Sequence, residues 1–166
     1  MYYLPAASYN LNNEEKHEMC VWLKKLKVPS GFCSSIWSIV SMKDLTLTNY
    51  NSHDCHVILT TFLPIAIRAI NPVWIKVAVT RLCYFFNRIS QKVIESDELV
   101  SLKEFAVETV SQFEMCFPPA FFDVMVHLVV HLVSQIEALS PMYLHEMWMY
   151  ERFMLIQMAM YQLVLV

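Results

Sequence analysis

Glycine is almost absent from this chain of 166 residues, which contains only Gly31. The glycine-rich motifs of dinucleotide-binding proteins, P-loop proteins and α/β-hydrolases are therefore excluded. Asn-Gly turns, the strongest local signal for a β-hairpin, are missing as well. Charged residues are scarce, at 16% against 57% hydrophobic residues, and the formal net charge is −3. This composition provides no basic surface for binding nucleic acid alone, and it is typical of a piece that packs against something larger.

Cysteine is present without any motif. The five cysteines are odd in number, widely spaced and never form C-x-x-C. This pattern favours a reducing, intracellular compartment in which the thiols are small buried hydrophobes. Long apolar runs are also missing, since no stretch reaches 18 uninterrupted apolar residues, and we expect no membrane span.

The apolar residues recur with helical spacing along most of the chain, which predicts an all-α fold. We expect a single domain of about six to seven helices. The first helix is expected to begin at Asn12 or Asn13, with acidic residues in its first turn and lysines near its end. Further helices are expected at about 34–41, 54–69, 72–93 and 96–117, after Pro118-Pro119, and after Pro141.

Two local details follow from the same pattern. Residues 43–51 are polar and β-branched and are predicted to form a loop, and Ser52 or Asp54 is the expected N-cap of the helix that follows. The apolar stripe expected for the helix over 72–93 comprises Trp74, Val77, Ala78, Leu82, Phe85, Ile89 and Val93.

The helix after Pro118-Pro119 is nearly all apolar but carries one polar ridge. Its members recur every four residues and so share one helix face: Asp123, His127, His131 and Gln135. A His-x-x-x-His pair is half of a tetrahedral zinc site, which needs two more ligands. The alternative is a pair of core histidines bonded to Asp123, to the backbone or to water.

Two other groups of polar residues are candidates for weaker reasons. The cluster His53, Asp54, Cys55 and His56 has metal-ligand chemistry, but consecutive helical residues point in different directions, so at most two could share a metal. A capped helix start with one buried histidine is the favoured interpretation. A modest basic character over the central helices indicates either phosphate contact in a larger protein or a solvated face, and it comes from Arg68, Lys76, Arg81, Arg88 and Lys92.

Over residues 13–154 the chain resembles a plant domain of unknown function that lies C-terminal to the catalytic region in transposases of the En/Spm (CACTA) type. The resemblance is carried by the segments EEKHEMC, LKVPSGF, VSMKDLTL, SHDCHVILT, LPIAIRAI, AVTRLCYFFNRISQKVI, FEMCFPPAFFDVMVHLVVHLV and HEMWMYERFM. It divides the chain into a loose leader at 1–12, a transposase-associated helical domain at 13–154 and a divergent apolar tail at 155–166. It also implies that the chain is a fragment of a larger protein, derived from a transposon.

The resemblance assigns roles to three residues. It implies that His127 and His131 are half of a zinc site whose cysteine pair lies upstream in relatives. It also implies that Glu151 is the third acid of a DDE-type nuclease, with Glu146 as competitor. In that class three carboxylates hold two metal ions, which activate the attacking oxygen and stabilise the leaving one. If the role is not retained, Glu151 pairs with Arg152 or another surface cation.

The first two acids of such a site are not found in this chain, so we expect no enzymatic activity from it alone. Zinc and magnesium are implied only for a full-length parent, as is binding to DNA together with the upstream catalytic region. A nuclear location follows if that role in DNA transposition is retained. No membrane and no small-molecule substrate is expected. The alternative, from a different class, is a non-catalytic helical module that binds a protein partner through its apolar surface.

Overall fold

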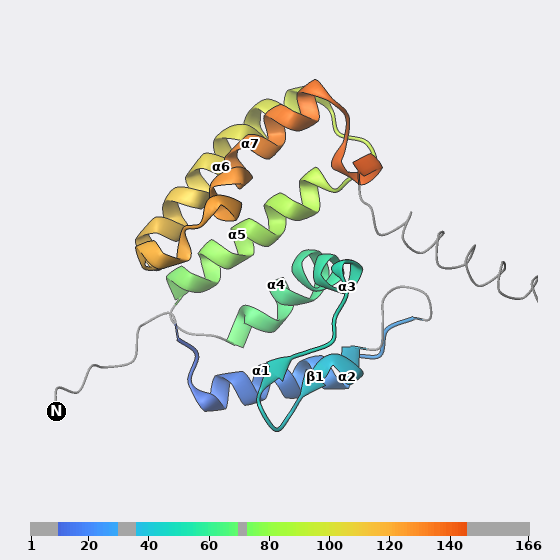
Figure 1. Cartoon of the computed structure of the whole chain (residues 1–166), viewed down its shortest axis with the longest axis vertical. Helices are drawn as coiled ribbons and strands as arrows, with labels where there is room; N and C mark the ends of the chain where they lie inside the picture. The colour runs from blue at the N-terminus through green and yellow to red at the C-terminus, as the bar shows by residue number, and fades with distance from the viewer. Residues whose placement is uncertain (1–9, 30–35, 70–72, 146–166) are drawn as a thin grey trace, which may run out of the picture.

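A computed structural model describes residues 10–29, 36–69 and 73–145 of the chain (Figure 1).

The first helix begins at a pair of residues that cap each other. In α1 (Asn13–Lys25) the side chain of Asn12 accepts from the backbone of Glu15, and the Glu15 carboxylate accepts from the backbone of Asn12, at 2.8 and 2.9 Å. This capping box satisfies two of the backbone donors that every helix start leaves unpaired. The predicted start at Asn12 or Asn13 is confirmed.

A small hairpin follows α1 and corrects the sequence prediction. After α2 (Ile36–Ile39), strands β1 (Val40–Ser41) and β2 (Thr46–Leu47) pair antiparallel, with Val40 opposite Leu47. Residues 43–51 are therefore not all loop. The tight connection is made without glycine, because Leu45 adopts a positive φ of 51° and the Ser41 hydroxyl donates to Asp44 at 2.9 Å. The missing Asn-Gly signal did not exclude a hairpin here.

The next helical stretch is continuous but changes its winding. It comprises α3 (Ser52–Val57), the π-helical η1 (Ile58–Phe62), α4 (Leu63–Ala66) and the 3₁₀-helical η2 (Ile67–Ala69). Pro64 has no backbone N–H to offer the carbonyl of Thr60, and a wider turn accommodates its ring. The side-chain amide of Asn87 donates to the Thr60 carbonyl instead, at 3.5 Å.

The second half of the chain is a group of three helices. Figure 1 shows α5 (Val73–Ile89), α6 (Ser96–Cys116) and α7 (Val124–Ala138) side by side, with the 3₁₀ turns η3 (Pro119–Phe121) and η4 (Met142–His145) after α6 and α7. Helix α5 ends four residues before the predicted Val93. The described part of the chain has seven α-helices and one small sheet, so the all-α class is confirmed.

Two hydrophobic clusters hold the described residues together. The first joins α1, α2 and β1 to α3 and η1, with Leu23 and Ile36 almost fully buried. The second joins α5, α6 and α7 and includes Phe85, Ala106 and Val133, each 0% exposed. Contacts of α4 and η1 with α5 connect the two halves. In the described ranges, no helix combines the length and the hydropathy that a membrane crossing requires.

Candidate functional site

The polar ridge of α7 faces solvent. Helix α7 packs into the core through Val129, Val133 and Ile136, while Asp123, His127, His131 and Gln135 are all exposed. The interpretation of the two histidines as core residues is therefore wrong. The opposite face of α7 already fills the core with aliphatic side chains, so the imidazoles need no buried partner.

Asp123 has a local task at the start of this helix. Its carboxylate accepts from the backbone N–H of Val126 at 3.2 Å, which is the geometry of an N-cap. The backbone N–H of His127 donates to the Asp123 carbonyl at 3.3 Å. Asp123 thus sets where α7 begins and, with it, where the two histidines lie.

The two histidines converge. Their Nε2 atoms lie 3.1 Å apart, and the ring centroids are 5.0 Å apart with the planes at 69°. With one proton between them, one ring donates and the other accepts. Two nitrogen ligands of one tetrahedral zinc ion lie ~3.3 Å apart, given Zn–N distances of ~2.0–2.1 Å. The distance between the two nitrogens is therefore close to that in half of a zinc site.

Among the residues that the structure describes, the other half of such a site is not found near the pair. Within residues 10–29, 36–69 and 73–145, no three His, Cys, Asp or Glu side chains form a group that could hold a metal ion. Glu151, the inherited acid, and its competitor Glu146 lie outside the described residues, so their assigned role stays a prediction.

The cluster at His53 to His56 is a helix start. The N-cap is Asn51, whose side chain accepts from the backbone of Asp54 at 2.8 Å, while the Asp54 carboxylate accepts from the backbone of Asn51 at 3.3 Å. The predicted N-cap at Ser52 or Asp54 is wrong. Asp54 is instead the N3 residue of the capping box, three positions after the N-cap, and its carboxylate makes the reciprocal hydrogen bond. Asp54 is buried and Cys55 is exposed, so these two candidate ligands do not share a site.

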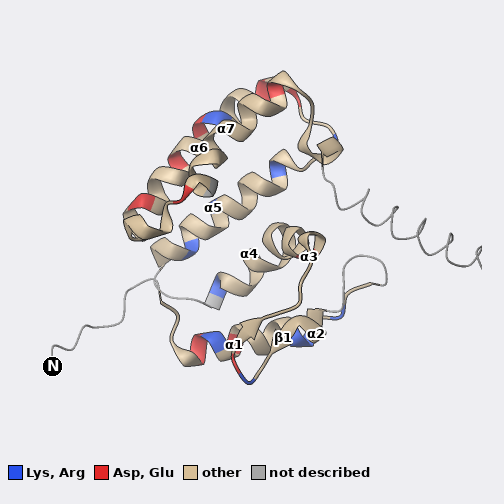
Figure 2. Ribbon diagram, viewed as in Figure 1, with Lys and Arg blue, Asp and Glu red and all other residues tan. Residues whose placement is uncertain are grey.

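Most basic residues of the central helices interact with a partner within the chain. The ribbon in Figure 2 marks positions of basic residues along α5 and several positions of acidic residues along α6. Arg81 pairs with Glu108 at 2.6 Å, and Arg88 pairs with Glu98, whose hydrogen bond raises the pKa of the guanidinium. The ammonium of Lys76 donates to the carbonyl of Arg68 at 2.8 Å. These partners explain the basic character as part of the helix packing.

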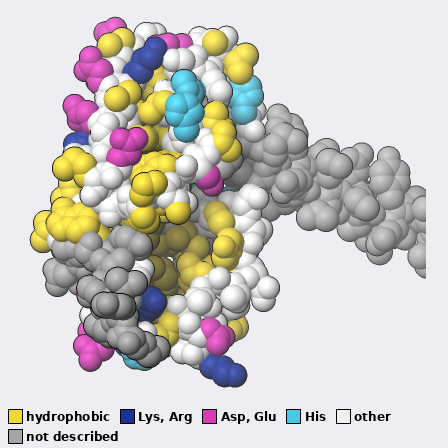
Figure 3. All heavy atoms as spheres, turned by 60° about the vertical axis from the view of Figure 1, so that its left-hand side comes forward, with side chains coloured by type: hydrophobic (Ala, Val, Ile, Leu, Met, Phe, Trp, Pro, Cys, Tyr) yellow, Lys and Arg dark blue, Asp and Glu magenta, His cyan; other side chains and the backbone are white. Residues whose placement is uncertain are grey.

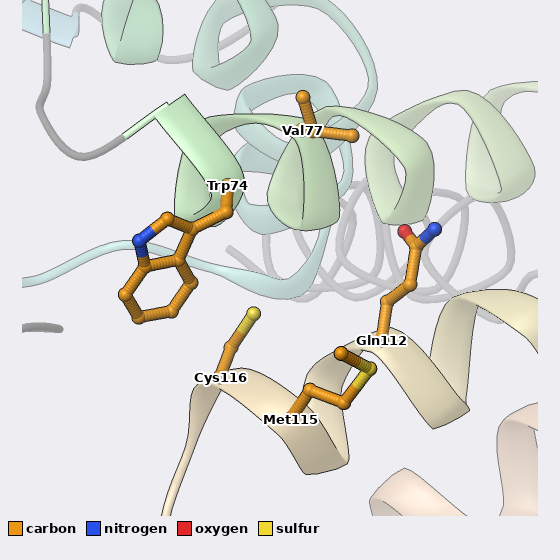
Figure 4. A pocket seen from close by; sticks show the side chains of 5 residues that line it. All are labelled: Trp74, Val77, Gln112, Met115 and Cys116. Carbon is orange, nitrogen blue, oxygen red and sulfur yellow. The ribbon is translucent and has the colours of Figure 1, made fainter.

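An apolar groove between α5 and α6 was not predicted. It has a volume of about 390 Å³ and is lined by Trp74, Val77, Gln112, Met115 and Cys116 (Figure 4). Trp74, Val77 and Val93 belong to the stripe that we expected to be buried, yet all three are exposed, whereas Ala78, Phe85 and Ile89 are buried. The surface in Figure 3 shows hydrophobic side chains over much of one face.

The described residues form a small helical domain with a histidine pair on its surface. Comparison with known proteins adds a family match. Residues 89–162 match the family model described as Domain of unknown function (DUF4218), which covers less than half of the chain. No curated protein and no solved structure matches. The match supports the expected domain of unknown function and spans all three candidate site residues: His127, His131 and Glu151. The transposase setting, the plant origin and the boundaries at 13–154 stay predictions.

The matched range begins inside a packing unit. Ile89 is the last residue of α5, so the match takes in α6 and α7 but leaves out Phe85, which is 0% exposed in the core that these helices share. The three helices therefore form one unit that begins before the matched range.

Proposed function

We propose that this chain is a transposase-derived helical module, the insertion and last-helix part of a DDE-type DNA transposase of the En/Spm (CACTA) type. The proposal is supported by the segments that carry the resemblance, which extend over 13–154. The family match at 89–162 lies almost wholly within that range and supports the domain of unknown function. On its own the module has no activity, because a two-metal site cannot be held by one acid.

The observation that carries the proposal is the geometry of the histidine pair. An exposed pair with its nitrogens 3.1 Å apart is open to ligands from another part of a larger protein. In the parent, His127 and His131 hold a zinc ion together with two cysteines of the upstream region. The zinc joins the helical module to the catalytic region, which is the usual task of a closed four-ligand site.

Glu151 supplies the third carboxylate of the catalytic centre in the parent. Together with the two upstream aspartates it would hold magnesium ions, which would supply activation of the attacking oxygen and stabilisation of the leaving one. DNA is a partner only in that assembly, which is consistent with the engaged arginines of α5 in the isolated module.

Metal analysis of a complex tests the zinc role. Co-expression of this chain with the upstream region of an intact relative is expected to retain about one zinc ion per complex, the content of a single four-ligand site. His127→Ala should lose it, because a tetrahedral site does not survive with three ligands and an open position in a structural role. Gln135→Ala, on the same exposed face, should keep it. An absence of zinc from both the parent complex and the Gln135→Ala complex would contradict the proposal.

A non-catalytic module that binds a protein partner is the second candidate. It is favoured by large apolar side chains at the surface, of which Met115 is 85% exposed. The genomic sequence upstream separates the two. Strand-rich segments with two aspartates and a C-x-x-C there favour the transposase origin, and a promoter followed directly by a start codon favours the second candidate.

A further inference from the structure

The histidine pair belongs to a longer exposed stripe of α7. The residues of this stripe recur at helical spacing, so they share one side of the helix, and all of them are exposed: Val124, His127, Leu128, His131, Gln135 and Ala138. Val124 is 66% and Leu128 is 38% exposed, so apolar side chains lie beside the two imidazoles. The stripe is an open helix face with a pair of metal-ligating groups at its middle.

The stripe carries no formal charge when the histidines are neutral. In α7 only Glu137 is charged, and it follows Gln135 by two positions, which places it outside the stripe on the turn of the helix. Like charges that meet across an interface oppose association. A face without formal charge can therefore meet an identical copy of itself without this penalty.

The pair supplies two of the four ligands of a zinc ion. The Nε2 atoms of His127 and His131 lie 3.1 Å apart, against the ~3.3 Å that separates two nitrogen ligands of a tetrahedral zinc. Zinc takes a lone pair from each Nε2. The ring that holds its proton at Nε2 therefore becomes the Nδ1 tautomer by exchange with water, and both rings stay neutral with no net release of a proton.

The missing two ligands have a natural source in a second copy. The part of the chain that the structure describes contains no group of three His, Cys, Asp or Glu side chains that could hold a metal ion. A second copy presents the same pair with the same separation. Opposite edges of a tetrahedron have equal length, so two such pairs occupy one zinc ion, and a twofold axis through the metal exchanges them.

The tetrahedron also determines how the two copies meet. Opposite edges of a tetrahedron are perpendicular, and the spacing of four residues places each pair roughly along its helix. The two α7 helices therefore cross steeply, and their contact is confined to the turns around the pair, where Val124 and Leu128 lie. A stable interface buries about 1,200–2,000 Å². One steep crossing of two helices falls short of this area, so the copies need the metal to stay together.

We propose that one zinc ion joins two copies of this chain through His127 and His131 of each copy, with the α7 helices crossed at the metal. The proposal does not rest on the transposase origin, since it uses only the geometry of the pair and the composition of the stripe. In the proposed parent, the upstream cysteines take the two positions that the second copy takes here.

A zinc titration of the full chain without an affinity tag tests the proposal. Sedimentation velocity is expected to show a monomer in EDTA and a dimer once about half a zinc ion per chain is present, the content of one four-ligand site between two copies. Added EDTA should return the monomer. His127→Ala and His131→Ala should stay monomeric in the same zinc concentration. His17→Ala is the matched control, because His17 is also an exposed histidine on a helix, and it should dimerise like the parent.

Cobalt(II) in place of zinc identifies the ligands. Cys55 is exposed and is the competing ligand on the described surface. A site of four imidazoles gives the strong visible absorption of tetrahedral cobalt without the near-ultraviolet band of a cobalt–thiolate bond.

Four outcomes overturn the proposal: no retained zinc, one zinc in each monomeric chain, a dimer that persists in EDTA or in His127→Ala, and a thiolate band that disappears in Cys55→Ser. None of them affects the proposed function, because the complex with the upstream region would still hold its zinc through the cysteines.

Discussion

The packing that presents the histidine pair depends on Val133. This residue is 0% exposed and lies two positions after His131, on the face of α7 that meets α5 and α6. Val133→Ala removes the two methyl groups that fill this space. Val107→Ala is the matched control, because Val107 is also in the interior of a helix but is 52% exposed.

The expected magnitude follows from burial and helix propensity. Each buried methyl or methylene group contributes about 0.8 kcal/mol, and a residual cavity adds about 24 cal/mol per Å³. The loss at Val133 is therefore about 2–3 kcal/mol, from which the better helix propensity of Ala recovers about 0.5 kcal/mol. The control should stay within about 0.5 kcal/mol of the parent. A net loss of about 2 kcal/mol is a large fraction of the about 5–15 kcal/mol typical of a small domain.

Urea unfolding followed by circular dichroism measures both variants. The midpoint is expected to fall for Val133→Ala with an unchanged slope, which indicates a loss of stability without a change in the surface exposed on unfolding. Val107→Ala should keep the midpoint of the parent. Equal effects of the two substitutions would refute the reasoning, because the difference between them rests entirely on the burial of Val133 between the three helices.

Two further predictions concern single side chains. In an intact relative, replacement of the residue at the position of Glu151 by Gln should abolish strand cleavage and leave DNA binding in place, since the carboxylate holds metal rather than substrate; cleavage at the parent rate would remove it from the mechanism. Burial raises the pKa of the Cys83 thiol from 9.0 to about 11, so at pH 8 iodoacetamide should modify the exposed Cys55 well before Cys83. Because the unfolded thiol ionises first, the free energy of unfolding should also fall as the pH rises from 9 to 11, and Cys83→Ala should remove that part of the pH dependence.

The helix starts show how far local sequence signals reach. Asn12 and Glu15 form a capping box that the sequence makes visible, because the interaction joins residues three apart. The start of α3 uses the same device, but Ser52, Asp54 and Asn51 are all good N-caps, and the pattern does not choose among them. The hairpin at β1 and β2 was missed because its turn depends on a positive φ at Leu45, a conformation that the residue type does not favour.

For the candidate site, too, the sequence predicts some features and leaves others open. The spacing of His127 and His131 places both on one helix face, and any helix over 124–138 would bring them together. Whether that face is buried depends on the other helices. In α7 nearly every position around the ridge is apolar, which is why core histidines were an alternative to the zinc half-site from the sequence alone.

Helix α5 shows the same limit of sequence-based prediction over a whole helix. Its apolar residues surround most of the helix, and the expected stripe combined two different faces: Ala78, Phe85 and Ile89 meet the core, while Trp74 and Val77 line the open groove. Composition and spacing were enough for the all-α class and for most helix positions, because caps and helical periods join residues within four positions. The choice between two apolar faces is made by contacts between residues far apart in the chain, such as Phe85 with the helices that contain Ala106 and Val133, and it becomes visible only when the helices are packed.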